Sequence, residues 1–196
     1  MQWLIFTGRF QPFHNGHAAV LQRSREVLSM RGEGASLVLA IIASSPGTAN
    51  SGSQFTRTAD EHHAASRNPW CAGTRLAALN SLLAEIADPR ILITVMPRPD
   101  LSWELVDAWF PGKRTWIIPE AGEEFDDNKA AFFASQGDGV LRIPETTGAS
   151  GRLLRDAWLE RNEALFRAGV PKACFEVYWK EALDQNESMG GHISKP

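Results

Sequence analysis

Residues 3–42, WLIFTGRFQPFHNGHAAVLQRSREVLSMRGEGASLVLAII, decide the fold of this chain. The short apolar run at 3–6 is stopped by polar residues and glycine, which predicts a buried strand. Apolar side chains recur at helical spacing over 16–30, so we expect an amphipathic helix that Gly32 ends. The apolar run at 36–42 predicts a second buried strand. A strand, a helix and a second strand in such close succession form a βαβ unit, which predicts a parallel sheet.

The rest of the chain continues this alternation. Further strands are predicted at 91–95, 115–118 and 139–143, and helices at 71–86, 101–110, 151–168 with a break near Asn162, and 172–183. We expect one domain over 1–184 and a disordered tail over 185–196, because the tail is polar and contains glycine. Residues 44–69 show no period, and a loop of this length is often a functional lid.

Composition narrows the classes of protein. The chain has 196 residues, of which 43% are hydrophobic and 22% charged, as in soluble globular proteins. The formal net charge of −3 argues against a dedicated nucleic-acid binder, which usually carries a basic surplus. Cys71 and Cys174 belong to no CxxC pair, so we expect two reduced thiols in a cytoplasmic protein. We expect no membrane partner, since no apolar run reaches the roughly 20 residues of a membrane span.

The segment GRFQPFHNGH, residues 8–17, joins the first predicted strand to the first helix. Ligands of open parallel sheets bind beyond the carboxyl ends of the strands, where this segment lies. Asn15 is a good N-cap, and the helix start behind it would offer N–H groups to an anion. Gly8 and Gly16 would let a ligand approach the backbone closely.

Two histidines and an arginine give this loop its chemistry. His14 and His17 are three residues apart, so both imidazoles can donate hydrogen bonds to an oxygen whose charge grows during attack at phosphorus. Arg9 adds a permanent cation with bidentate reach. No serine or cysteine is paired with either histidine, which indicates direct transfer without a covalent intermediate.

GRFQPFHNGH resembles the GRFxPxHxGH motif of the nucleotidyltransferase superfamily, which has a Rossmann-like three-layer α/β/α fold. The resemblance implies a five-stranded, mostly parallel sheet and assigns catalytic roles to His14, His17 and Arg9. It also implies that ATP is bound by the other residues in and beside the loop, namely Thr7, Gly8, Phe10, Gln11, Asn15 and Gly16.

Two further segments resemble the family's acceptor site. Residues 66–75, SRNPWCAGTR, resemble the N-P-[FW] segment, ending in arginine, of archaeal-type and Nudix-fused nicotinamide mononucleotide adenylyltransferases. The turn at 97–100 resembles the family's Pro-x-Pro-Asp turn beside the nicotinamide pocket. A tryptophan after this turn could stack on a pyridinium ring, with Trp109 as the competing candidate and core packing as the alternative for both. The acceptor-binding residues implied are Arg67, Asn68, Trp70 and Trp103.

Residues 150–155, SGRLLR, resemble the family's S-x-T-x-[IL]-R motif, in which a helix N-terminus and an arginine hold the β- and γ-phosphates. Ser150 would be the N-cap and Arg155 the phosphate ligand. Arg152 stands where the family has threonine, so it either supplies an extra cation to the triphosphate or weakens the site.

These segments together predict an enzyme that transfers AMP from ATP to nicotinamide mononucleotide, giving NAD and pyrophosphate. Mg²⁺ should accompany ATP, held by phosphate oxygens and water and by no metal cage of the protein. The chain could also form a homo-oligomer, as relatives do. Two alternatives stay open: a nucleotidyltransferase with a CTP donor or a pantetheine-phosphate-type acceptor, and a nucleotide-binding sensor that has lost turnover.

Overall fold

The computed structural model describes residues 1–43, 68–120, 124–144 and 150–180. Its centre is a five-stranded sheet in the order β3-β2-β1-β4-β5, and all four strand pairs are parallel. The predicted parallel sheet is therefore confirmed. The strands are β1 (Gln2–Gly8), β2 (Ala35–Ile42), β3 (Ile91–Met96), β4 (Lys113–Glu120) and β5 (Gly139–Pro144).

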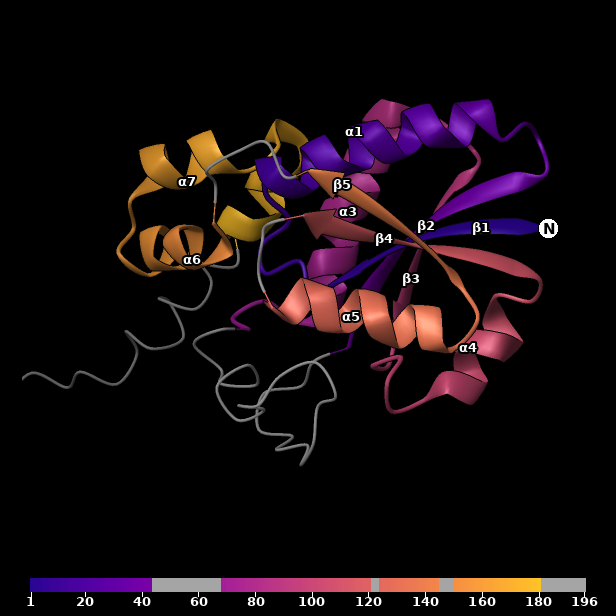
Figure 1. Ribbon diagram of the computed structural model, residues 1–196. Coiled ribbons are helices and arrows are strands. Elements are labelled where there is room, and N and C mark those ends of the chain that lie inside the picture. Colours follow the sequence, from indigo (N-terminus) through magenta and orange to yellow (C-terminus); the bar gives the residue numbers. More distant parts are fainter. Residues whose placement is uncertain (44–67, 121–123, 145–149, 181–196) are drawn as a thin grey trace, which may run out of the picture.

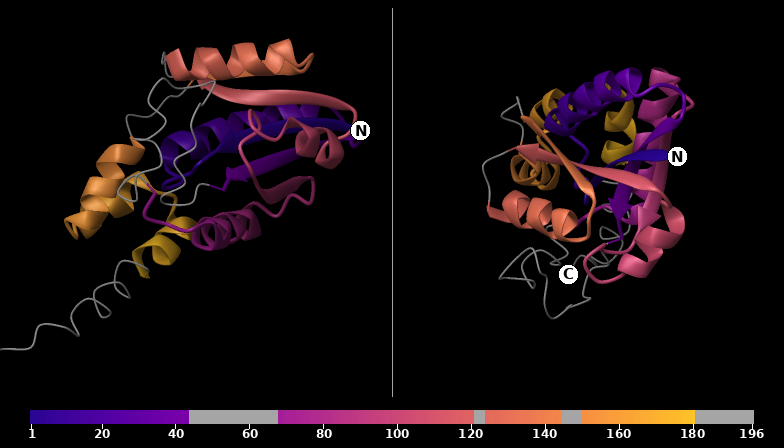
Figure 2. Two further views of the ribbon diagram at one scale, coloured as in Figure 1. Left: turned by 90° about the horizontal axis from the view of Figure 1, so that it is seen from below. Right: turned by 45° about the vertical axis from the view of Figure 1, so that its right-hand side comes forward.

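Helices cover both faces of the sheet and form the predicted α/β/α layers (Figure 1). α1 (Asn15–Met30) and α3 (Ala72–Ile86) pack on one face, and α4 (Trp103–Trp109) and α5 (Glu124–Ser135) pack on the other. Figure 2 shows α5 and α3 on opposite sides of the strands. The chain winds toward β3 after β1 and toward β5 after β4, and right-handed crossovers place the two sets of helices on opposite faces.

This reversal of direction lies between β1 and β4, which are neighbours in the sheet. A crevice for ligands is expected at such a point, beyond the carboxyl ends of the two strands. The loop before α1 and the start of α5 flank it from opposite faces. The fold thereby positions residues 8–17 at the ligand-binding end of the sheet.

The helix α5 corrects the sequence-based prediction, which placed no element between β4 and β5. Its apolar residues are Phe125 and an unbroken run at 130–134, which do not give the regular spacing of an amphipathic helix. Three acidic residues in its first turn favour a helix start through the helix dipole, but they give no amphipathic pattern. Burial of Ala130 and Phe133 against the sheet stabilises this helix. The helix therefore depends on tertiary contacts, which the local sequence pattern does not reveal.

The C-terminal segments pack at the carboxyl end of the sheet, beside the start of α1 (Figure 1). They comprise α6 (Gly151–Leu159), α7 (Glu163–Gly169) and a helical stretch at 172–180. The predicted break near Asn162 is confirmed, since the side chain of Asn162 caps α7 by accepting a hydrogen bond from Leu165 N at 3.2 Å. The predicted lid at 44–69 lies outside the described residues except for its last two positions, as does the tail at 185–196.

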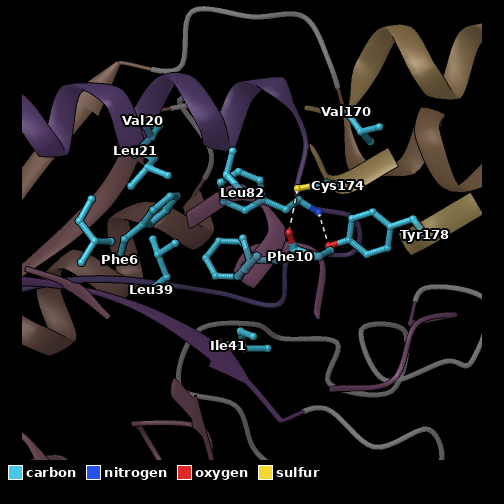
Figure 3. Close-up of a cluster of buried hydrophobic side chains, with 14 of the residues drawn as sticks. Phe6, Phe10, Val20, Leu21, Leu39, Ile41, Leu82, Val170, Cys174 and Tyr178 are labelled. Atoms are coloured by element: carbon cyan, nitrogen blue, oxygen red, sulfur yellow. Dashed lines mark hydrogen bonds between the residues drawn. The ribbon is translucent and has the colours of Figure 1, made fainter. Parts of the chain in front are cut away.

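The larger core lies between the sheet and the helices α1 and α3, and it extends to the C-terminal segments. Side chains of Phe6 and Leu39 from the sheet meet Val20 and Leu21 of α1 in Figure 3. Cys174 joins the same core; burial raises the pKa of its thiol to about 12, and its Sγ donates to Ala78 O at 3.4 Å. None of the described helices is both long and apolar enough to cross a membrane.

Candidate active site

The loop between β1 and α1 ends in a helix cap that differs from the predicted one. His14, and not Asn15, is the N-cap of α1: its Nδ1 accepts hydrogen bonds from Gly16 N at 3.1 Å and His17 N at 3.4 Å. His17 completes a capping box, because its Nδ1 accepts from His14 N at 3.3 Å. Asn15 is the first residue of the helix, and its side chain donates to Ala168 O at 2.9 Å. An imidazole can do what Asn, Asp, Ser or Thr usually does at this position.

The two imidazoles stack on each other, with ring centroids 3.8 Å apart and an interplanar angle of 25°. Both rings use Nδ1 as an acceptor, so the proton of each neutral imidazole lies on Nε2. Burial and, after it, the nearby Arg155 cation lower the pKa of His14 from 6.5 to about 4. Burial, then His14 and Lys129, lower the pKa of His17 well below its usual value. The site therefore offers two neutral rings whose Nε2–H groups are donors at neutral pH.

Arg9 and Asn68, predicted to act on different substrates, lie together. Arg9 Nη1 donates to Asn68 Oδ1 at 3.5 Å, although the two residues are 59 positions apart. Asn68 is 3% exposed, so its amide supports the guanidinium from within the protein. Arg67 lies outside the described residues.

Gln11 and Trp70 connect the loop to the chain before α3. The side chain of Gln11 donates to Trp70 O at 2.7 Å and accepts from Trp70 N at 3.2 Å. Both hydrogen-bonding groups of the Gln11 amide are thus used inside the protein. The side chain of Gln11 is therefore a strut between two segments of backbone, and binding of ATP by Gln11 stays a prediction.

Trp70 and Phe10, predicted to bind the acceptor and ATP, are both buried in the core. Trp70 is 0% exposed, and its indole packs against Trp158, Phe166 and Tyr178. It offers no face for stacking on an acceptor, since the apolar face is covered by core residues. Phe10 is 1% exposed and packs edge-on against Phe6 and His17.

Gly8 makes room for Phe10, and this differs from the expected close approach of a ligand. A Cβ on Gly8 would lie 2.8 Å from Cε1 of Phe10, which is inside the contact limit. Thr7, next to it, is 4% exposed, and its Oγ1 has no hydrogen-bond partner among the described residues. A buried hydroxyl of this kind usually bonds to something, so Thr7 stays a candidate ligand-binding residue.

Arg75 stabilises the loop at residues 8–17 from inside the protein, and the sequence did not reveal this role. Its side chain is 0% exposed, so the guanidinium lies inside the protein. Its Nη1 donates to Arg9 O at 2.7 Å and to Ile42 O at 2.9 Å, and its Nε donates to Cys71 O at 3.2 Å. One guanidinium thereby joins the loop after β1, the end of β2 and the start of α3.

The N-terminus of α6 lies beside the histidines. Ser150 is its N-cap, as predicted, and accepts from Leu153 N at 3.1 Å. A Cβ on Gly151 would lie 3.2 Å from Gln11 O and 3.8 Å from Cδ2 of His14, so this helix start touches the loop. Arg155 Nη1 donates to Gln11 O at 2.6 Å, which brings its charge next to His14. Arg152 is exposed in the first turn.

Trp103 is not part of this cluster. Its ring packs against Trp116, Phe132 and Phe133 on the other face of the sheet, and Arg114 lies over it at 5.2 Å. Arg114 is the second residue of β4, so Trp103 lies toward the amino end of the strands, away from His14. Core packing, the alternative that the sequence left open, accounts for this position of Trp103, and its contact with the acceptor stays a prediction. The competing candidate, Trp109, is 42% exposed at the end of the same helix.

Two residues near the site were missed by the sequence analysis. Lys129 of α5 is 8% exposed and lies close enough to His17 and Arg9 to affect them electrostatically. Tyr178 accepts a hydrogen bond from Phe13 N at 3.1 Å through its Oη, shown dashed in Figure 3. α5 was not predicted, and Tyr178 lies 165 residues from Phe13, so no local pattern could have pointed to either.

The charges at this site are cationic, with two neutral imidazole donors between them. Within the part of the chain that the structure describes, no group of three or more His, Cys, Asp or Glu side chains lies together as metal ligands would. Such an arrangement fits a polyanion, because Arg155 lies next to His14, Arg9 belongs to the same loop, and the starts of α1 and α6 meet there.

Known proteins agree with this geometry. Residues 5–93 match the family model described as cytidylyltransferase-like. A nicotinamide-nucleotide adenylyltransferase of Ignicoccus hospitalis is 30% identical over 181 residues, which are 91% of this chain and 84% of that protein.

Solved structures share the fold. A putative nicotinate-nucleotide adenylyltransferase from Vibrio parahaemolyticus superimposes with a TM-score of 0.56 at 13% identity, over 90% of this chain and 97% of that chain. Thermotoga maritima TmcAL, solved with alpha-thio ATP bound, gives a TM-score of 0.54 at 12% identity, over 94% of this chain and 56% of the longer TmcAL chain. On the strength of the Ignicoccus relative, the chain belongs to the nicotinamide-nucleotide adenylyltransferase family of nucleotidyltransferases.

Proposed function

We propose that this protein transfers AMP from ATP to nicotinamide mononucleotide, giving NAD and pyrophosphate. The main support for this proposal is the stacked pair of His14 and His17. Backbone hydrogen bonds to both Nδ1 atoms leave both Nε2–H groups as donors. The name and the extent of the Ignicoccus relative support the choice of acceptor.

The reaction is a direct in-line displacement. A phosphate oxygen of the acceptor attacks the α-phosphorus of ATP and forms the new P–O bond, while the bond from the α-phosphorus to the bridging oxygen breaks and pyrophosphate leaves with that oxygen. The two Nε2–H donors and Arg9 stabilise the charge that develops on the α-phosphate oxygens. Because both donors are fixed by the backbone before ATP arrives, little reorganisation is needed in the transition state.

The N-terminus of α6 would bind the leaving pyrophosphate. Ser150 caps this helix, so its first N–H groups face the loop, and Arg155 adds a cation. Arg155 donates to Gln11 O in the structure described here, and a triphosphate would offer its guanidinium a stronger, charged acceptor. Arg152, exposed in the first turn of α6, is a further candidate for the outer phosphates.

Mg²⁺ should enter with ATP. The described residues around the loop supply cations and imidazoles and no carboxylate cage, so the ion would be held by phosphate oxygens and water. When bound, it would neutralise part of the triphosphate charge. The protein's own residues orient the phosphates. We keep cytoplasmic location, one domain over 1–184 and assembly into a homo-oligomer as further proposals.

The test is incubation of the protein with ATP, nicotinamide mononucleotide and Mg²⁺, with pyrophosphate and NAD both measured. We expect equal amounts of the two products, formed about 10²- to 10³-fold more slowly by the variant His17→Ala. Product formed only with CTP, with pantetheine phosphate or with the deamidated mononucleotide would replace the proposed substrates. Tight ATP binding without pyrophosphate from any acceptor would instead identify a sensor.

A further inference from the structure

Lys129 is a buried cation that the proposed function has not used. It lies on the inward face of α5, and its side chain is 10% exposed. Its Nζ lies 4.0 Å from Oδ1 of Asp126 and 5.2 Å from the ring of Phe125. The first distance is too long for a hydrogen bond, and within the described part of the chain this ammonium donates none. The ring of Phe125 and the carboxylate of Asp126 lie near this largely buried ammonium but accept none of its N–H groups, so these donors are available to an anionic ligand.

The position of Lys129 connects it with the crevice between β1 and β4. α5 begins just after the carboxyl end of β4, so its first turns flank this crevice from the face opposite to α1. Thr7, at the end of β1, follows the alternation in which Ile5 faces the α4 and α5 side of the sheet. Its buried Oγ1, without a partner among the described residues, therefore lies on the same side as Lys129.

Lys129 interacts electrostatically with His17 and Arg9 of the catalytic loop, residues 8–17. After burial and His14, Lys129 is the third cause that lowers the pKa of His17. Burial lowers the pKa of Lys129 itself, Asp126 opposes this, and Arg9 lowers it as a smaller third cause. The middle of the loop is next to α6, since Arg155 acts on His14 and Gly151 lies against Gln11 O. Cations thus approach the histidine pair from two sides, with α6 on one and α5 on the other.

In-line transfer gives these two sides different roles. The attacking and leaving oxygens lie on opposite sides of the phosphorus, and α6 is assigned to the leaving pyrophosphate. We propose that Lys129 binds the phosphate of the acceptor nucleotide and holds it opposite to α6 for attack. This inference rests on the proposed function, because it takes the roles of α6 and of the histidine pair from it. The ligand class is a nucleoside monophosphate, recognised by its phosphate.

The test compares an acceptor with and without its phosphate. Binding of nicotinamide mononucleotide and of nicotinamide riboside, which lacks the phosphate, is measured by calorimetry with the variants Lys129→Met and Lys129→Arg. Lys129→Met should weaken binding of the mononucleotide about 10- to 100-fold, as loss of a charged hydrogen bond does, and leave the riboside unchanged. Lys129→Arg should recover part of the loss. Lys113→Met, an exposed lysine at the start of β4, is the matched control and should change neither.

The outcomes separate this inference from the proposed function. Equal losses for mononucleotide and riboside, or a loss confined to ATP, would overturn the role of Lys129 while NAD synthesis by the unaltered protein still stood. If the unaltered protein uses another phosphorylated acceptor, the proposed function fails, and the same comparison is made with that acceptor and its dephosphorylated form. A thermal melt of each variant shows whether the fold is intact, and Lys129→Arg covers the case in which Lys129→Met does not fold.

Discussion

His14 and His17 form a stacked pair in which each ring holds the backbone at the start of α1 and keeps its outer nitrogen protonated. The same two residues thus build the helix start and present the donors. The helix cap depends on neutral imidazoles, because Nδ1 can accept a backbone hydrogen bond only while it carries no proton.

This dependence predicts how stability changes with pH. The pKa of His14 is about 4 in the folded protein and 6.5 as the ordinary value, so the unfolded chain binds more protons between these values. Stability from His14 is complete above pH 6.5 and is lost as the pH falls toward 4. The full loss is on the order of 3 kcal/mol. Urea unfolding at several pH values measures it.

A variant isolates the contribution of His14. His14→Asn keeps an N-cap acceptor but has no group that titrates in this range. Its free energy of unfolding should therefore depend less steeply on pH between 4 and 6.5 than that of the unaltered protein. Identical pH profiles for the two proteins would show that the cap does not depend on the protonation of His14.

His17→Ala should lower turnover by about 10²- to 10³-fold, the usual effect of removing one preorganised donor. Its fold should survive, with a stability loss of about 1 kcal/mol from the missing half of the capping box. Pyrophosphate release and a thermal melt measure the two effects. His17→Gln is the control for the cap, because glutamine can also bond back to His14 N. An unchanged rate in His17→Ala would remove its catalytic role.

Arg155→Ala and Arg152→Ala should differ in their effect on ATP. Arg155 is half-buried beside the loop, whereas Arg152 is exposed. We expect about 10- to 100-fold weaker ATP binding for Arg155→Ala and less than about 5-fold for Arg152→Ala, because an exposed cation is screened. Titration with a non-hydrolysable ATP analogue measures both. A larger loss in Arg152→Ala would make Arg152 the principal cation for the triphosphate.

Tyr178→Phe should destabilise the catalytic loop without disturbing the core around it. The variant keeps the ring that packs on Trp70 but removes the acceptor for Phe13 N. An unsatisfied buried N–H costs about 1 to 3 kcal/mol, measured by urea unfolding. Trp158→Phe is a comparison within the same cluster, since it removes the donor to Tyr178 O and leaves Phe13 N paired. Equal protection of the Phe13 amide against hydrogen exchange in Tyr178→Phe and in the unaltered protein would refute the bond.

Local patterns predicted most of the fold. The apolar run of β1, the helical spacing of α1 and the run of β2 are properties of neighbouring residues, and they required a parallel sheet. Ser150 as a cap and Asn162 as a break were also predicted, because capping is a contact between residues three apart. α5 was missed because its stability comes from burial of Ala130 and Phe133 and not from its own pattern.

At the site, the sequence predicted which segment carries the chemistry but not how each side chain is used. From the sequence we predicted that His14, His17 and Arg9 share one loop and that α6 lies near this loop. We also predicted Asn15 as the cap, and we assigned Gln11, Trp70 and Trp103 to ligands. Gln11 and Trp70 bond to each other across 59 residues, and Trp103 packs on Trp116.

The sequence by itself determined the order of the strands and of the helices other than α5, the loop at the end of β1 and the residues able to bind a phosphate there. Only the tertiary structure decided which of them are buried struts, such as Gln11 and Arg75, and which face the crevice. It also brought Lys129 and Tyr178 to the loop from distant parts of the chain. The physical reason is that secondary structure depends on neighbours in sequence, whereas burial and hydrogen-bond partners depend on neighbours in space.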